Sequence, residues 1–216
     1  MIFPSDGRDF LRNLNVNNSR DWFQAHKTVY EHHVKQPAAN LCSAITEGLA
    51  ELLGAEIDSK TFRIHRDVRF SKDKTPYAPY VRIGLWESGA GIQKPMSGPA
   101  FYLSIEPEQL IVGAGCMAMP TEILEAYRHR VSTDGGDLAG LMAELQNTGA
   151  RFDPPALKRV PRGYIKDHPN GELLKRKGIT CWHDNALSPD EPITAETCIM
   201  HFKAALPIYH FVESLN

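Results

Sequence analysis

Three short apolar segments follow one another in the middle of the chain, and they restrict the fold more than any other feature. Residues 80–86, 101–105 and 110–115 are rich in β-branched and aromatic side chains. The last two are separated only by a few turn residues around Pro107. Connections this short favour antiparallel neighbours. Residues 62–70 alternate between apolar and polar side chains, which predicts one more strand ahead of these three.

Helical periodicity surrounds this strand-rich region on both sides. Apolar residues recur at helical spacing in 6–14, 19–30, 37–53, 121–131, 137–149 and 194–212. Pro37 suits a first helical turn and Gly54 suits a helix end. Residues 179–182 predict a further short strand. The pattern therefore predicts an α+β fold, a mainly antiparallel β-sheet packed against several α-helices. No repeat or linker interrupts it, so we expect a single domain over residues 1–216.

Charge is distributed unevenly along the 216 residues, whose formal net charge is only −2. The first basic segment, residues 60–94, carries eight Lys and Arg against three acids. The second basic segment, residues 158–177, carries seven against two. The rest of the chain is strongly acidic. Two basic segments in an acidic chain favour a local anion site and argue against a protein that is coated with nucleic acid.

The four cysteines have no metal-binding or redox spacing. Cys42, Cys116, Cys181 and Cys198 lie among apolar neighbours and form no CxxC pair. We therefore expect reduced, buried thiols. The first residues lack the charged-then-apolar pattern of a secretion signal, and no apolar run approaches membrane-spanning length. These observations predict a cytoplasmic protein with no membrane partner.

The first basic segment is the strongest candidate for function. If residues 62–70 are extended, Phe62, Ile64, Val68 and Phe70 point toward the core, and the alternate residues point away from it. Arg66 would then share the apolar face. A buried guanidinium needs a carboxylate or carbonyl partner, so Arg66 has a specific partner or lies at the sheet margin.

We expect the cations of both segments to meet and to bind a phosphate-bearing or other anionic small molecule. His65 or His168 would transfer protons, oriented by Asp67 or Asp167. The sequence leaves open whether such a site carries out a reaction. No His or Cys pair has diagnostic metal spacing, so no metal site is expected, and no cofactor is identified. The expected ligand-binding residues are Arg63, Arg66, Arg69, Lys72, Lys74, Tyr77, Arg162 and Lys177.

Two alternatives remain open at this point. The protein could be a binding module for nucleic acid or an acidic protein, which would need a flat basic face and salt-sensitive binding. Alternatively, the basic segments could be structural networks in which each arginine is paired with a carboxylate. An exposed cluster is tolerable, since two like charges ~6 Å apart repel by only ~0.7 kcal/mol in water.

Several stretches also resemble a known family. They are NNSRDWF at 17–23, the block FRIHRDVRFSKDKTPY at 62–77, FYL at 101–103, LKRVPRGYIKDHP at 157–169 and LLKRKG at 173–178. Together they resemble domain-of-unknown-function family 2461, conserved hypothetical proteins of bacteria and fungi, from about Phe10 to Val212. The resemblance implies a single α+β domain in the cytoplasm and no established reaction. The chain departs from it at Ala78, where a lysine is often found, and in the glycine turn 113–116.

Overall fold

The centre of the structure is a six-stranded sheet in which every pair of neighbours is antiparallel. The computed structural model describes residues 1–89, 97–184, 186 and 191–215. The strand order is β2-β3-β4-β5-β7-β6, so β7 lies between two strands that precede it in the chain. The strands are β2 (Ile57–Thr61), β3 (Val81–Glu87), β4 (Ala100–Ile105), β5 (Leu110–Cys116), β6 (Arg151–Phe152) and β7 (Ile179–His183).

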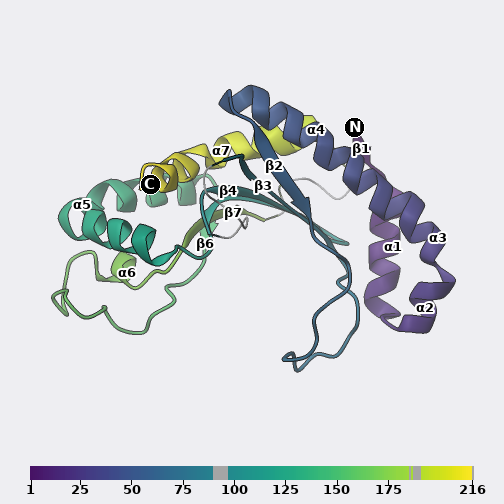
Figure 1. Ribbon diagram of the computed structural model, residues 1–216, viewed down its shortest axis with the longest axis horizontal. Coiled ribbons are helices and arrows are strands. Elements are labelled where there is room, and N and C mark those ends of the chain that lie inside the picture. The colour runs from purple at the N-terminus through teal and green to yellow at the C-terminus, as the bar shows by residue number, and fades with distance from the viewer. Residues whose placement is uncertain (90–96, 185, 187–190, 216) are drawn as a thin grey trace.

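Helices pack against one face of this sheet and lie at both of its ends, which confirms the predicted α+β fold (Figure 1). A separate pair of strands, β1 (Ile2–Phe3) and β8 (Ile193–Thr194), joins the N-terminal segment to the start of the last helix. A π-helical turn, η1 (Glu31–Lys35), precedes α4. The α-helices are α1 (Ser5–Val16), α2 (Arg20–Ala25), α3 (Lys27–Tyr30), α4 (Gln36–Leu53), α5 (Thr121–Asn147), α6 (Gly171–Leu174) and α7 (Ala195–Glu213).

One face of the sheet packs against α4 and α7 (Figure 1). The inward side chains of β3, β4 and β5 are almost all apolar and fully buried there. Phe101 of β4 stacks on Tyr209 of α7 with ring centroids 4.5 Å apart, and Phe202 lies 5.1 Å away. Helix α7 begins at a capping box formed by Thr194 and Thr197. The main core therefore lies between the sheet and these two helices.

Most predicted element boundaries agree with the structure, with a few differences. Helix α4 has Pro37 in its first turn and ends at Gly54, whose φ of 66° is left-handed. Helix α1 begins at Ser5, with Pro4 before it, and so extends beyond the predicted stretch 6–14 at both ends. The two helices predicted at 121–131 and 137–149 form one element, α5, with non-helical φ and ψ at Asp134.

The strand predicted at 62–70 is wrong. Strand β2 ends at Thr61, and residues 62–80 form an irregular loop with a single bridge between His65 and Tyr77. Pro76 and Pro79 lack an amide hydrogen, so the returning limb of this loop cannot form a continuous ladder. The burial of the side chains agrees with an irregular loop, since Phe70 is 95% exposed and Phe62 37% exposed, whereas Ile64 is buried.

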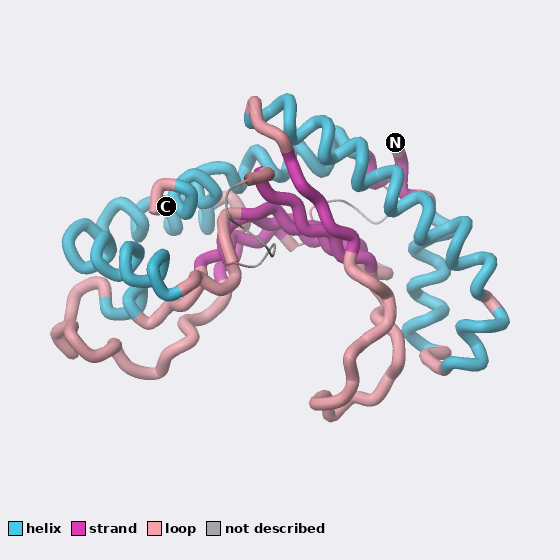
Figure 2. The backbone as a smooth tube through the Cα atoms, in the orientation of Figure 1, coloured by secondary structure: helices cyan, strands magenta, loops and turns pink. Residues whose placement is uncertain are grey.

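Among the described residues no helix covers the other face of the sheet, which forms the underside of an arch (Figure 2). Helices α1–α3 lie at one end of the arch, and α5 and α6 lie at the other. The loop 62–80 descends at the first end and the loop 153–170 at the second (Figures 1 and 2). We call the face between them the open face. It is where functional side chains can reach a ligand.

Two further expectations concern burial. All four cysteines are buried thiols, as predicted. None of the helices in the described part of the chain has the length and apolar character needed to cross a membrane. The expectation of one domain stays a prediction.

Candidate anion-binding site

Strand pairing places two rows of residues on the open face. Residues paired directly across antiparallel strands lie on the same face of a sheet. The first row is Gly84, Tyr102, Gly113, Trp182 and Arg151. The second row, two residues along the strands, is Arg82, Ser104 and Ile111. Five strands from distant parts of the sequence therefore contribute to one surface.

Trp182 and Tyr102 form an aromatic floor on this face. Their ring centroids are 5.6 Å apart. The Trp182 ring lies directly against Gly113, where a Cβ atom would also be only 2.6 Å from the Cys181 carbonyl oxygen. Trp182 Nε1 donates a hydrogen bond to Asp153 Oδ2 over 2.9 Å. The indole is thus held in one orientation. Burial raises the pKa of Tyr102 above its ordinary value, so its phenol stays protonated at neutral pH.

A cavity of about 580 Å³ lies above this floor. Its volume is within the range of about 300–1,000 Å³ that is typical of small-molecule sites. The loop 62–80 forms one wall and the strands form the base. Its aromatic lining residues are Phe62, Tyr80, Tyr102 and Trp182, and its basic ones are Arg63, His65, Arg66, Arg82 and Arg151. Its acidic lining residues are Asp67, Glu106 and Asp153.

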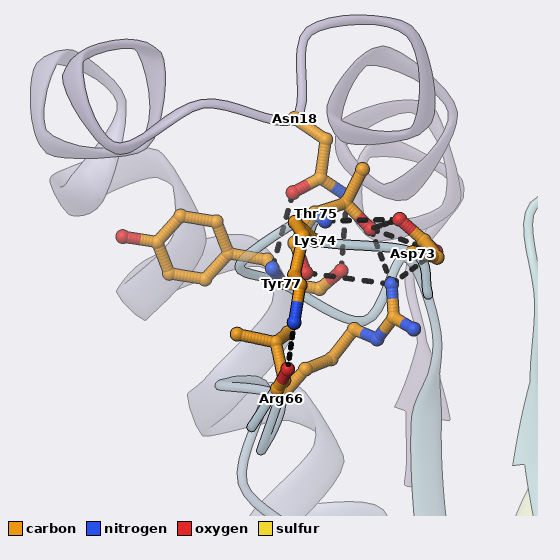
Figure 3. Close-up of polar contacts among 7 residues, drawn as sticks. Asn18, Arg66, Asp73, Lys74, Thr75 and Tyr77 are labelled. Atoms are coloured by element: carbon orange, nitrogen blue, oxygen red, sulfur yellow. Dashed lines mark hydrogen bonds and ion pairs between the residues drawn. The ribbon is translucent and has the colours of Figure 1, made fainter. Parts of the chain in front are cut away.

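Two of the cavity's four arginines are neutralised by the protein. Arg66 pairs with Asp73 and also donates to the Thr75 hydroxyl (Figure 3). The sequence had left two possibilities open for Arg66, a specific partner or a place at the sheet margin, and the structure has the partner. Arg151 pairs with Asp153 over 3.0 Å and with Asp184. These two guanidinium groups hold the walls of the cavity together.

Arg63 and Arg82 differ from the other two arginines. Within the described parts of the chain, neither forms an ion pair with an acidic side chain. Arg82 Cζ lies 4.1 Å from the centroid of the Tyr80 ring. Arg63 is near enough to contribute to lowering the pKa of Asp67, although the hydrogen bonds from Arg69 lower it more. Both side chains belong to exposed residues, so a ligand in the cavity can reach them.

The three carboxylates of the cavity already have partners. Asp67 accepts two hydrogen bonds from the Arg69 side chain, from Nε over 2.9 Å and from Nη2 over 2.6 Å. Asp153 holds Arg151 and Trp182, as described above. Glu106 accepts from the Gln109 amide over 2.9 Å and from the Ser104 hydroxyl over 3.3 Å. The positive charge of Arg63 and Arg82 therefore remains the least compensated in the cavity.

The structure does not bring His65 and Asp67 together as a dyad, because Asp67 bonds to Arg69. The described contacts of His65 are with aromatic rings, Tyr77 at 5.0 Å and Phe23 at 6.0 Å between centroids. His65 nevertheless lines the cavity together with Arg63, Arg66 and Asp67.

Four other predicted residues lie in the same loop but do not line the cavity, namely Arg69, Lys72, Lys74 and Tyr77. Tyr77 is buried and stacks on Phe23 with centroids 4.1 Å apart. Its amide donates to the Asn18 side chain and its carbonyl accepts from it (Figure 3). Lys74 Nζ donates to the Val68 carbonyl over 2.9 Å. These contacts anchor and close the loop.

The second basic segment lies apart from the first. Arg162, Asp167 and His168 line another cavity, of about 810 Å³, formed by the loop 153–170 and the start of α6. His168 Nδ1 accepts a hydrogen bond from the Asn170 amide over 3.0 Å. Lys177 lines neither of these two cavities. The expected convergence of both segments on one pocket is therefore not what the structure has.

Sequence reasoning missed the residues of the sheet that complete the cavity. They include Arg82, Tyr102, Ser104, Arg151 and Trp182, and Tyr80 just before β3 was missed as well. A signal was present, since Arg82 and Ser104 are polar residues inside otherwise apolar strands. Strand pairing was needed to recognise that these residues share one face.

Acid should loosen the loop 62–80. The Thr75 amide, followed by Arg66 and the Thr75 hydroxyl, lowers the pKa of Asp73 to about 2 from an ordinary value of 3.8. An ionised Asp73 therefore stabilises the folded loop above pH 4, and this contribution is lost as the pH falls from about 4 to 2. Carboxyl-carbon NMR should give a pKa of about 2 for Asp73, and a higher one in Arg66→Ala. A wild-type value near 4 would contradict the described contacts.

Comparison with known proteins identifies the family of the chain. A family model described as "Conserved hypothetical protein (DUF2461)" matches residues 7–211, which is nearly the whole chain. No curated protein matches the sequence. The description of the family names neither a ligand nor a reaction.

Proposed function

We propose a function from the cavity on the open face, because the chain belongs to the DUF2461 family of conserved hypothetical proteins and the description of that family names no activity. The protein binds an anionic small molecule, such as a phosphate-bearing metabolite, whose charge is held by Arg63 and Arg82. Both arginines line the cavity, and both lack an ion pair among the described residues. This observation carries the proposal.

The chemistry of the guanidinium group supports an oxyanion as the ligand. Its planar set of N–H donors matches the oxygens of phosphate and carboxylate and can bind them in a bidentate manner. Arg82 lies over the Tyr80 ring, which limits the positions that its guanidinium adopts. A side chain that is already ordered loses less conformational entropy when the ligand binds.

The two alternatives explain less of the site. A structural network accounts for Arg66, Arg69 and Arg151, each of which has a carboxylate partner. It leaves Arg63 and Arg82 unexplained. A nucleic-acid or acidic-protein module would use a continuous basic face, whereas acidic side chains also line the cavity and the two basic segments line different cavities. We also propose a cytoplasmic location, which the buried thiols support.

Anions should raise the melting temperature of the wild-type protein. Ligand at a hundred times its Kd stabilises the folded state by about 2.7 kcal/mol, or about 5–10 °C for a chain of this length. We expect this shift for at least one of phosphate, pyrophosphate and citrate. It should disappear in the Arg63→Ala/Arg82→Ala double variant.

Lys72→Ala and Arg159→Ala are the matched controls. Each removes one exposed cation from a basic segment without touching the lining of the 580 Å³ cavity. Both should retain the full shift. If none of the anions stabilises the wild type, or if the controls lose the shift as completely as the double variant does, the proposed site is wrong.

A further inference from the structure

The cavity is larger and more aromatic than a site for a simple anion needs to be. Its volume of about 580 Å³ suits a whole small molecule. Its base is formed by Trp182 and Tyr102, and apolar side chains such as Ile111 and Met117 also line it. An inorganic ion between Arg63 and Arg82 would leave this part of the cavity unfilled.

The two arginines without an ion pair and the Trp182 indole lie at different ends of the cavity. Arg82 is on β3, and Arg63 follows β2 at the sheet's edge. Trp182 is on β7, three strands from β3, which is about 14 Å across the sheet. Arg151, the cation nearest to Trp182, is occupied by Asp153 and Asp184. A ligand that uses both ends must therefore carry its charge at one end and an apolar or aromatic group at the other.

Trp182 is fixed in place and partly open to the cavity, with the Arg151 guanidinium 5.7 Å from its ring centroid. One face of the indole rests on Gly113, which has no Cβ atom to hold the ring away from the strand. Its Nε1 is tied to Asp153, which Arg151 holds in turn. The indole is only partly buried and lines the cavity. A fixed indole of this kind is a platform on which bases stack, a contact worth about 1–3 kcal/mol per base.

The acids of the cavity restrict the uncharged end further. Ionised carboxylates accept hydrogen bonds and repel negative charge. Asp153 lies beside Trp182, and Glu106 lies just beyond the end of β4. A ring with N–H donors suits these neighbours better than a second anionic group. Nucleobases with amino groups have this character.

We propose that the ligand of this cavity is a nucleotide, with its base stacked on Trp182 and its phosphate held by Arg63 and Arg82. The inference rests on the proposed anion site and specifies its ligand. The phosphate and base belong to a free mononucleotide or to one unit of a single strand, and the two sources share this chemistry.

Calorimetric titration with AMP, ribose 5-phosphate and a single-stranded tetranucleotide tests the inference. AMP should bind the wild type about tenfold or more tightly than ribose 5-phosphate, because only AMP has the stacking ring. Trp182→Leu should weaken AMP binding about 5- to 150-fold, which corresponds to about 1–3 kcal/mol. It should leave ribose 5-phosphate binding unchanged. Trp22→Phe, which changes an indole outside this cavity, should behave as wild type.

A second measurement uses protein that retains Trp182. In Trp22→Phe/Trp86→Phe, which keeps Trp182 as the one remaining tryptophan of the three in the sequence, AMP should quench tryptophan emission and ribose 5-phosphate should not. This readout also covers the case in which Trp182→Leu fails to fold. A tetranucleotide that binds more tightly than AMP, with a steep dependence on salt, supports the inference and identifies a strand as the source.

The failures of the two proposals can be distinguished. Equal binding of AMP and ribose 5-phosphate, unaffected by Trp182→Leu, overturns the nucleotide inference and leaves the anion site in place. If neither these ligands nor inorganic anions bind, both proposals are overturned.

Discussion

Replacing Phe101 by alanine should lower the free energy of unfolding by about 3–5 kcal/mol, the usual cost of removing a buried phenyl ring. Phe101 has no exposed surface and lies between Tyr209 and Phe202. The cavity left behind would lie where β4 meets α7, and rigid neighbours on both sides limit its collapse. Since domains are stable by only about 5–15 kcal/mol, the loss is a large fraction of the total.

Urea unfolding followed by circular dichroism measures this effect. Phe70→Ala is the matched control, because Phe70 is 95% exposed and its loss should change stability by less than about 0.5 kcal/mol. Similar midpoints for the two variants would show that the packing between β4 and α7 is not as described.

Gly115→Ala should be comparably destabilising, for two separate reasons. The φ of Gly115 is 134°, which side chains rarely tolerate, and strain of this kind costs about 1–3 kcal/mol. A Cβ atom would also collide with the Ile179 carbonyl oxygen and approach the Thr180 Cα to 2.9 Å. Crowding adds about 1–3 kcal/mol. We therefore expect a total of about 2–6 kcal/mol.

Gly163→Ala separates the two contributions. Gly163 has a φ of 93°, but no atom lies within 4 Å of the position that its Cβ would occupy. This control should lose only the part of the free energy of unfolding that is due to backbone strain, and its tryptophan emission should match that of the wild type. In Gly115→Ala, displacement of β7 should also change the tryptophan emission, because Trp182 lies on β7. Equal destabilisation of the two variants would argue against close contact between β5 and β7.

Local patterns were sufficient to predict much of the fold. The helical spacing in 37–53 with Gly54 after it, and the apolar runs in 101–105 and 110–115, correspond to α4, β4 and β5. The strand predicted at 62–70 does not form, because alternation of apolar and polar side chains does not by itself supply a partner strand. The limb opposite these residues contains Pro76 and Pro79, which cannot donate to a ladder. Their charged residues instead bond within the loop, as Arg66 does to Asp73 and Arg69 to Asp67.

The candidate site was only half predictable for a different reason. Arg63, His65, Arg66 and Asp67 belong to a basic segment that is evident in the sequence. Arg82 and Trp182 are a hundred residues apart, and they share a face only because β7 pairs with β5. Short connections can indicate which sequential strands are neighbours, but no local signal indicates where a strand from the end of the chain will insert.

The position of β7 between β5 and β6 has a consequence for the order in which the molecule can be completed during synthesis. Until residues 179–183 leave the ribosome, β5 presents an unpaired edge and β6 has no neighbour in the sheet. Exposed edges of this kind invite pairing with other chains. A nascent chain of this protein is therefore most vulnerable to aggregation after β5 emerges and before β7 follows. The Trp182 indole takes its place on the open face only once β7 has paired with β5.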